Sequence, residues 1–254
     1  MSYKPFTSAE ESFAHSREIR DMLYEHDDFM ASVGTLADMG CGEGLDLEWW
    51  ATRTTRDETP IPLNIKCVGI DVLPELSVAH RYPNIQYQQQ DFEKPIMQSN
   101  RKFDIIWSHD SLQYAINPMQ TLLQWREAIN DSGMLILSVP QTTNLEFNVQ
   151  EYNQHDYCYY NWTIVSLIHM LAITGWDCAG GHFLKNLDDP WINAIVYKSN
   201  QEPLDPRTTR WYTLAEQGLL PESAVKSVYK RGFLRQADLV LPWLDGSLAH
   251  LGKQ

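Results

Sequence analysis

Hydrophobic and polar positions along the chain follow two alternating periods. Short apolar runs, typical of buried strands, are separated by stretches in which apolar residues recur at steps of three and four, as on one face of a helix. The apolar runs predict strands at Thr35–Met39, Lys66–Val72, Ile85–Gln90, Phe103–Ser108, Met134–Val139 and Trp191–Tyr197. The periodic stretches predict helices at Ala9–Met30, Leu45–Arg53, Pro74–Arg81, Pro118–Asn130 and Thr163–Thr174.

Local signals mark one end of two of these helices. Asn117 provides an N-cap and Pro118 a first-turn proline for one helix. Gly175 stands where a left-handed C-cap belongs after another. Strands that alternate with helices of this length form βαβ units. The pattern therefore predicts an α/β fold, a doubly wound and mainly parallel sheet with helices on both faces.

The pattern changes after Ser199, where prolines recur and no βαβ unit can be traced. We therefore expect a domain over residues 1–199 and a C-terminal, mostly helical extension over residues 200–254. The extension is expected to pack on the domain or on a partner subunit, because its large apolar residues need burial. These are Trp211, Tyr212, Leu219, Leu220, Leu239, Val240 and Trp243.

Composition narrows the class of protein. The chain has 254 residues, 43% of them hydrophobic, and a formal net charge of −13, which disfavours a nucleic-acid partner. No apolar run approaches the roughly 18 residues of a membrane-spanning helix, and the N-terminus is polar, so a cytoplasmic protein without membrane contact is expected. The four cysteines form no CxxC pair, which favours reduced thiols over a disulfide or metal framework.

The candidate chemistry begins in the first βα turn, which reads Asp38-Met39-Gly40-Cys41-Gly42-Glu43-Gly44. Ligands of doubly wound sheets bind at this position, and glycines allow the backbone to approach them closely. The spacing is GxGxG rather than the GxGxxG of dinucleotide sites. Asp38 and Glu43 would also repel a pyrophosphate. The loop therefore favours a ligand with positive charge and no phosphates.

This loop, "ADMGCGEG", resembles the first motif of class I S-adenosylmethionine-dependent methyltransferases, in particular the type 11/12-like enzymes that act on small molecules. The resemblance implies the Rossmann-like fold of that family and S-adenosylmethionine as cofactor, with S-adenosylhomocysteine as product. The segment "FDIIWSHDSLQYAINPMQTLLQWREAINDSGMLILSVP" is similar to the family's fourth and fifth strands with the helix between them. The implied cofactor-binding residues are Asp38, Gly40, Cys41, Gly42, Gly44, Asp71, Val72, Asp91, Phe92 and Ser108.

Acids at the ends of the next two predicted strands extend the match. Asp71 ends an apolar strand, where a carboxylate can accept both hydroxyls of a ribose. The resemblance places Val72 beside the adenine, Asp91 on the adenine amino group and Phe92 on the ring. Asp71 lies 33 positions after Asp38 (71 − 38), and we interpret the polar stretch "TTRDETPIPLN" between them as an insertion.

Two histidines are the candidate catalytic residues. His109 follows the fourth predicted strand and His155 lies in the segment after the fifth, where the family builds its substrate pocket. Each is either a general base or a wall of the pocket. The amino-methylating tetrapeptide Asn/Asp-Pro-Pro-Tyr/Phe of DNA enzymes is absent after the fourth strand. The prediction is therefore transfer to a small molecule, at oxygen or nitrogen, by a chain that acts alone or as a homodimer.

Two other classes of function stay open. A methyltransferase-like binding or scaffold protein would keep the cofactor site and catalyse nothing, with residues 200–254 as a partner surface. A nicotinamide-dependent oxidoreductase would use the same fold, although the GxGxG spacing and Asp38 oppose it.

Overall fold

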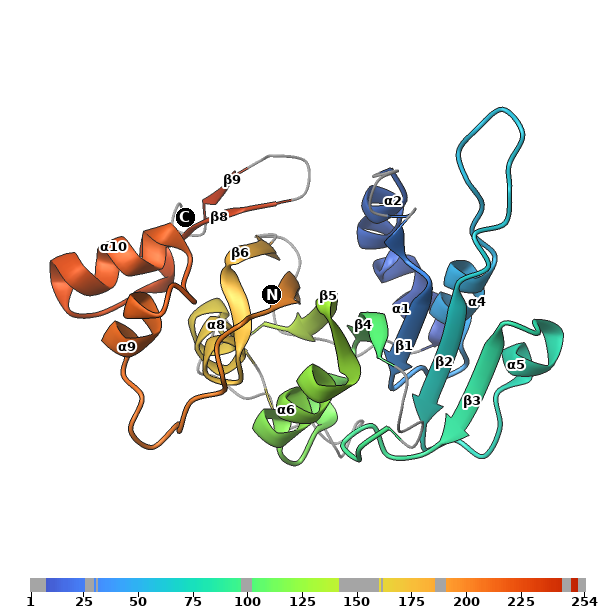
Figure 1. Cartoon of the computed structure of the whole chain (residues 1–254), viewed down its shortest axis with the longest axis horizontal. Helices are drawn as coiled ribbons and strands as arrows, with labels where there is room; N and C mark the ends of the chain where they lie inside the picture. The colour runs from blue at the N-terminus through green and yellow to red at the C-terminus, as the bar shows by residue number, and fades with distance from the viewer. Residues whose placement is uncertain are drawn as a thin grey trace.

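The computed structural model describes residues 8–25, 30, 32–96, 102–141, 160, 162–185, 191–243 and 248–250. A seven-stranded sheet with the order β3-β2-β1-β4-β5-β7-β6 crosses the molecule (Figure 1). All neighbouring strands are parallel except the pairs β5–β7 and β7–β6, which are antiparallel. This confirms the predicted doubly wound sheet. The strands are β1 Thr35–Met39, β2 Lys66–Asp71, β3 Ile85–Gln89, β4 Phe103–His109, β5 Ile129–Pro140, β6 Trp176–Lys185 and β7 Trp191–Lys198.

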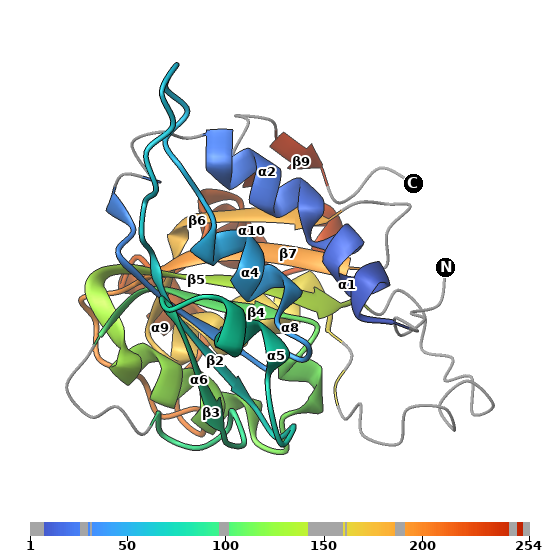
Figure 2. The same ribbon diagram turned by 90° about the vertical axis from the view of Figure 1, so that its right-hand side faces the viewer.

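Helices cover both faces of the sheet. One buried cluster joins residues of α2, α4 and α5 to one face, and a second joins residues of α6 and α8 to the other. In Figure 2 the helices α1, α2 and α4 lie together on the near face. Burial on both faces explains why the inner strands β1, β2 and β4 are mostly apolar, whereas the edge strand β3 is polar and partly exposed. The helices are α1 Ala9–His15, α2 Arg17–Glu25, α4 Leu45–Ala51, α5 Ser77–Arg81, α6 Pro118–Ala128 and α8 Ile164–Ile173.

The predicted caps at Asn117 and Gly175 are confirmed. The Asn117 side chain accepts the Gln120 amide proton at 3.1 Å at the start of α6. After α8, Gly175 has a φ of +85°, the left-handed conformation expected of a C-cap glycine. A capping box of Thr163 and Ser166 begins α8. These local bonds satisfy backbone groups that the helices themselves leave unpaired.

The prediction of one helix over Ala9–Met30 is wrong, because the chain divides at Ser16 into α1 and α2. The carbonyl of Phe13 accepts a 2.6 Å hydrogen bond from Arg20 Nη2 and lies 3.0 Å from Ser16 Oγ. Side chains that bond a helix carbonyl compete with its regular backbone partner. The apolar positions at steps of three and four begin only at Ile19, so the pattern gave no sign of the break at Ser16.

Strand β6 is absent from the sequence prediction. Gly180 and Gly181 lower the strand propensity of this segment. In the structure the register with β7 shifts between Asp177 and His182. The Asp177 carboxylate accepts the backbone protons of Ala179 and Gly180 at 2.8 and 3.1 Å, which holds the irregular stretch. Tertiary pairing with β7 therefore overrides the local preference.

The polar stretch between α4 and β2 projects from the body of the protein, as the insertion prediction requires (Figure 1). Its two arms are joined by a bridge between Thr54 and Pro62 and by a 2.8 Å backbone bond from Thr55 to Ile61. Ile61, which takes part in this pairing, is 60% exposed. The insertion lengthens the βαβ unit without changing its topology.

The extension packs at the β6 end of the sheet. Arg126 of α6 donates hydrogen bonds to the carbonyls of Gly175, Ser199 and Gln201, and so fixes the point where the extension starts. Trp243 is buried and its Nε1 lies 3.0 Å from Met22 Sδ of α2. The elements of the extension are α9 Trp211–Glu216, α10 Glu222–Arg231, the 3-10 turn Gln236–Asp238, β8 Val240–Pro242 and β9 Leu248–His250.

Burial in the extension follows the prediction in part. Leu219, Leu220 and Leu239 are buried, whereas Tyr212 is 42% exposed beside Tyr229. Throughout the described ranges, no helix has the length and apolar character required to cross a lipid bilayer.

Candidate functional site

The glycine loop between β1 and α4 takes a conformation that side chains would disturb. Gly40, Gly42 and Gly44 have φ values of +77°, +51° and +79°. A Cβ at Gly40 would lie 2.6 Å from the Cβ of Ser111, and one at Gly44 would lie 2.8 Å from Leu76. The first and third glycines are therefore needed for both conformation and close packing, whereas Gly42 has open space beside it.

Asp71 at the end of β2 ties the loop to the neighbouring strand. Its Oδ2 accepts the backbone proton of Gly42 at 2.8 Å, and its Oδ1 accepts that of Leu73 at 3.1 Å. Val72 and Leu73 are 66% and 41% exposed, so an apolar surface lies beside the carboxylate. The carboxylate has further lone pairs that can accept hydrogen bonds from ribose hydroxyls, and the apolar surface beside it can pack against a flat base.

A cavity of about 210 Å³ lies at the carboxyl ends of β1 and β4, where the strand order reverses. This is where doubly wound sheets bind ligands. The glycine loop forms one side of the cavity, His109 and Asp110 at the end of β4 form another, and helix α1 covers it. The residues of α1 that line it are Ala9, Ser12 and Phe13.

The cavity is acidic. Asp38, Glu43, Asp46 and Asp110 line it, and no Lys or Arg is among the described residues that do so. Burial raises the pKa of Asp38 well above its usual value, and the nearby Asp46 and Asp71 raise it further. Because buried like charges are costly to ionise, a cationic ligand would lower the free energy of the whole group. The site fits an ammonium or sulfonium group.

Asp46 in the first turn of α4 connects the cavity to the N-terminal helices. Its Oδ1 lies 3.1 Å from Arg20 Nε and accepts a 2.7 Å bond from Ser16 Oγ, and its Oδ2 accepts a 3.1 Å bond from Trp107 Nε1. Burial raises the pKa of Asp46, although Arg20 opposes this shift. The Arg20 side chain is only 2% exposed. This buried pair ties α2 to α4, and Arg20 Nη2 also donates to the Phe13 carbonyl of α1, the helix that covers the cavity.

His109, predicted to follow the fourth strand, is the last residue of β4 and is buried. Its ring stacks on Trp191 at a centroid distance of 5.9 Å and an interplanar angle of 10°. Its ring nitrogens are bonded to Ser12 and His15 of α1. Burial lowers the pKa of His109 well below its usual value, and His15 and Arg20 lower it further. The imidazole is therefore neutral at physiological pH.

The other predicted site residues lie in different settings. Asp91 after β3 accepts the Glu93 amide proton at 2.9 Å, and Phe92 lies over Trp125 at 6.2 Å and close to Gly40. Cys41 lines the cavity, and burial raises the pKa of its thiol well above its usual value, which favours a packed residue over a nucleophile.

Five of the predicted cofactor residues are not among the residues that line this cavity: Asp71, Val72, Asp91, Phe92 and Ser108. Ser108 is buried with its Oγ 2.6 Å from Ser111 Oγ and does not line the cavity, so its contact with a cofactor stays a prediction. His155 lies outside the described residues.

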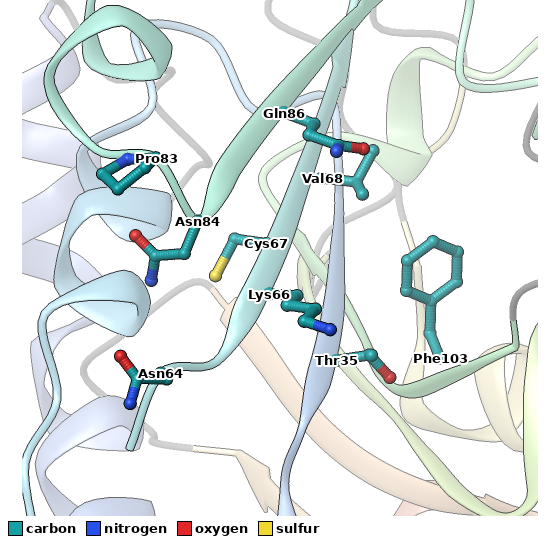
Figure 3. Close-up of a pocket in the computed structure, with 9 residues that line it drawn as sticks. All are labelled: Thr35, Asn64, Lys66, Cys67, Val68, Pro83, Asn84, Gln86 and Phe103. Atoms are coloured by element: carbon teal, nitrogen blue, oxygen red, sulfur yellow. The ribbon is translucent and has the colours of Figure 1, made fainter. Parts of the chain in front are cut away.

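A second hollow of about 410 Å³ lies at the amino ends of β1, β2 and β3 (Figure 3). Asn64, Lys66 and Asn84 lie at its rim. The Asn84 amide donates to the carbonyls of Ala51 and Ile65 at 2.9 Å each, so it supports the strand ends. Because ligands of this fold bind at the carboxyl ends of the strands, we assign the functional site to the acidic cavity.

Sequence reasoning missed the contribution of α1. Ser12 and His15 were assigned no role, and neither was Asp46, although all three belong to the hydrogen-bond network of the site. The polar residues Ser12 and Ser16 on one side of an amphipathic helix were the available signal. They indicate a helix that covers a polar site rather than the core.

Comparisons with known proteins agree with this geometry. Residues 32–200 match the family described as "Methyltransferase domain". The malonyl-[acyl-carrier protein] O-methyltransferase of Halalkalibacterium halodurans is 28% identical over 110 residues, which cover 41% of this chain. The match spans 38% of the length of that relative.

Solved structures share the fold at low identity. The 1,6-didemethyltoxoflavin-N1-methyltransferase of Burkholderia thailandensis, with bound 1,6-didemethyltoxoflavin and S-adenosylhomocysteine, superposes with a TM-score of 0.52 at 14% identity and covers 78% of this chain and 93% of that chain. An O-methyltransferase family protein from the same organism gives a TM-score of 0.54 at 13% identity, and the match covers 74% of this chain and 57% of that chain. At these identities the likeness concerns the fold alone.

Proposed function

Because the chain belongs to the methyltransferase-domain family, whose methyl donor here is S-adenosylmethionine, we propose that it methylates a small molecule, at oxygen first and at nitrogen as the second choice. The observation that carries the proposal is the acidic cavity under α1 at the end of β1. It has the charge that an ammonium and a sulfonium require, and it lacks the basic groups of a phosphate site.

The residues present fit this cofactor. The loop of Gly40, Cys41, Gly42 and Gly44 would hold its amino-acid part, with Asp38 beneath the ammonium. Asp71 would accept the ribose hydroxyls through the lone pairs that Gly42 and Leu73 leave unused. The proposed adenine contacts are Val72, Asp91, Phe92 and Ser108.

The bound cofactor supplies an electrophilic methyl group on a sulfonium. The chain must align the acceptor with this methyl group and exclude water, because proximity supplies much of the rate. Neutral His109 lines the cavity and can accept a proton from an acceptor hydroxyl. His155 is the second proposed catalytic residue. A neutral amine as acceptor needs no strong base.

A small molecule is favoured as acceptor by two features of the chain. The net charge of −13 opposes a polyanionic acceptor, and the site is a small cavity of about 210 Å³. The relatives include proteins named as an O- and an N-methyltransferase, which leaves both acceptor atoms open. We further propose that residues 1–199 form the catalytic domain and that residues 200–254 pack on it, with a homodimer as the arrangement to test.

The first test is calorimetric titration of the purified chain with S-adenosylhomocysteine, alongside Asp71→Ala. Micromolar binding, about −8 kcal/mol, that the variant loses would support the cofactor site. Binding of NAD in its place would favour an oxidoreductase.

A second experiment addresses the acceptor. The chain is incubated with methyl-labelled S-adenosylmethionine and a panel of small phenols, carboxylic acids, alcohols and amines, with RNA and protein extracts as comparisons. We expect label in one small-molecule class. Label only in RNA or protein would contradict the proposal, and cofactor binding with no transfer to any acceptor would favour the scaffold alternative.

A further inference from the structure

Helix α1 brings two polar side chains onto the last residue of β4. Ser12 Oγ lies 3.2 Å from His109 Nδ1, and His15 Nδ1 lies 2.9 Å from His109 Nε2. Ser12 and His109 both line the acidic cavity, whereas His15 is not among its lining residues. The order Ser12, His109, His15 therefore runs from the cavity outward.

The rings of this chain of hydrogen bonds are held in place by tryptophans. His109 is nearly parallel to Trp191, with an angle of 10° between the rings, and stacks on Trp107 at 6.4 Å and 22°. His15 also contacts Trp191, at a centroid distance of 4.8 Å. A ring packed against two tryptophans and bonded through both nitrogens cannot exchange those nitrogens without disturbing these contacts. Nδ1 of His109 therefore stays toward Ser12 and Nε2 toward His15.

A neutral imidazole has one donor nitrogen and one acceptor nitrogen, so this chain has two arrangements. In one, His15 donates to Nε2, and Nδ1–H of His109 donates to Ser12. In the other, His15 accepts from Nε2–H, and the Ser12 hydroxyl donates to Nδ1. Only the second arrangement leaves His109 able to take a proton from the cavity side.

This inference rests on the proposed methyl transfer. We infer that His15 is a positioning residue that accepts the Nε2–H of His109 and so leaves His109 Nδ1 unprotonated. During transfer, Ser12 Oγ takes the proton of the acceptor while His109 Nδ1 takes the hydroxyl proton of Ser12. His109 thus acts as a base through Ser12, and an acceptor that carries a hydroxyl or N–H group is the class that this chain serves.

The step balances in atoms and charge. The acceptor's lone pair forms the bond to the methyl carbon, and the carbon–sulfur bond breaks with its electron pair left on sulfur. The acceptor's proton moves to Ser12 Oγ, and the Ser12 hydroxyl proton moves to His109 Nδ1. One imidazolium replaces one sulfonium, and the His109 proton passes to water after the products leave.

The charged groups around His109 suit this exchange. On the cavity side lie the carboxylates of Asp38, Asp46 and Asp110. Burial lowers the pKa of His109, and Arg20 of α2, which is bound to Asp46, lowers it further. The ring is therefore neutral before transfer. The carboxylates that balance a cationic ligand balance the imidazolium afterwards, so the net charge of the site does not change.

The test is imidazole nitrogen NMR on the full chain labelled with ¹⁵N-histidine, at neutral pH, with and without S-adenosylhomocysteine. The His109 signals are assigned by their loss in His109→Gln. We expect a protonated Nε2 and an unprotonated Nδ1 in the wild type. His15→Phe keeps a ring on Trp191 but removes the acceptor, and is expected to give a mixture of both tautomers. His15→Asn places an amide oxygen where Nδ1 stood and should restore the single tautomer.

Each contrary outcome has a distinct meaning. A wild-type His109 protonated at Nδ1 would overturn the inference, and so would an unchanged tautomer in His15→Phe. If His15→Phe does not fold, as judged by thermal melting, the wild type and His15→Asn still decide the matter. Calorimetry with S-adenosylhomocysteine is independent of these signals. No binding by a wild type with the expected tautomer would instead remove the proposed function.

Discussion

Asp71 Oδ2 lies 2.8 Å from the backbone nitrogen of Gly42, so the acid at the end of β2 supports the glycine loop that follows β1. One carboxylate thus has two tasks. It fixes the conformation of the loop, and it presents its remaining lone pairs to the apolar surface at Val72, which is 66% exposed. A change at Asp71 should therefore affect ligand binding and loop order to different degrees, depending on the substitute.

Asp71→Asn keeps an oxygen for the Gly42 amide but removes the charge that would accept two ribose hydroxyls. Hydrogen bonds to charged groups contribute about 1.5–3 kcal/mol, so we expect the affinity for S-adenosylhomocysteine to fall about 10- to 100-fold. Calorimetry measures this. Asp57→Asn, in the exposed insertion, is the matched control and should bind as the wild type does. Equal affinity in both variants would remove Asp71 from the site.

Gly40→Ala tests the close packing of the loop. The new Cβ would lie 2.6 Å from the Cβ of Ser111, at a φ of +77°. Backbone strain and overpacking together should lower the free energy of unfolding by about 2–4 kcal/mol, as measured by urea unfolding of the protein without ligand. Gly42→Ala is the control, because its φ of +51° is also positive but nothing lies within 4 Å. Gly42→Ala should lower the free energy of unfolding only through backbone strain, by about 1–2 kcal/mol. Equal costs would show that Ser111 yields.

Asp38→Asn should stabilise the unliganded protein and weaken ligand binding. Burial raises the folded-state pKa of Asp38 well above its usual value. A raised pKa gives stability that is present below the unfolded pKa and is lost as pH rises through the folded one. The wild type therefore loses stability as pH rises, because Asp38 must ionise while buried. Asp38→Asn has no ionisable group at this position and does not lose this contribution.

The melting temperature measures this difference. The variant should melt above the wild type by about 2–4 °C for each kcal/mol gained, and the gap should widen from acidic to neutral pH. Its affinity for S-adenosylhomocysteine should fall, because the proposed ammonium partner is lost. A variant that melts below the wild type at every pH would contradict a strained carboxylate at this position.

Local signals explain how much of the fold the sequence predicted. Strand β1 has the predicted bounds because its side chains are almost all buried and three of its five residues, Leu36, Ala37 and Met39, are apolar. The glycine loop was found because positive φ values require glycine there. Strand β6 was missed because its pairing with β7 and the Asp177 bonds overcome two unfavourable glycines. Long-range pairing of this kind leaves no local periodicity.

The candidate site was predicted only on the side that the sheet supplies. Asp38, Asp71 and His109 end strands, and strand ends can be placed from sequence. Ser12 and Asp46 come from helices, and whether α1 covers the cavity depends on the fold of α1 back over α4. The polar residues Ser12 and Ser16 indicate a polar helix face but do not say which surface that face meets, so the contact with the cavity appears only in three dimensions.

The buried pair of Arg20 and Asp46 ties α2, which follows the covering helix α1, to α4, with 3.1 Å between Nε and Oδ1. Arg20→Met keeps much of the side-chain volume and leaves Asp46 buried without its cation. Breaking such a pair costs about 3–5 kcal/mol, which urea unfolding at neutral pH measures. Arg17→Met, where the replaced arginine is 76% exposed and pairs with Asp21, is the control and should change stability by less than about 1 kcal/mol.

The pH dependence separates lost charge pairing from lost packing. Burial already raises the pKa of Asp46 against the opposing effect of Arg20, so removal of Arg20 raises it further. By the same linkage, the free energy of unfolding of Arg20→Met falls more than that of the wild type as pH rises through the higher pKa of Asp46. The difference in stability between the variant and the wild type therefore shrinks at acidic pH. Adding Asp46→Asn should recover part of the loss and flatten the curve. A deficit that is constant with pH would mean that Arg20 acts through its packing on Phe13, 3.6 Å away, rather than through Asp46.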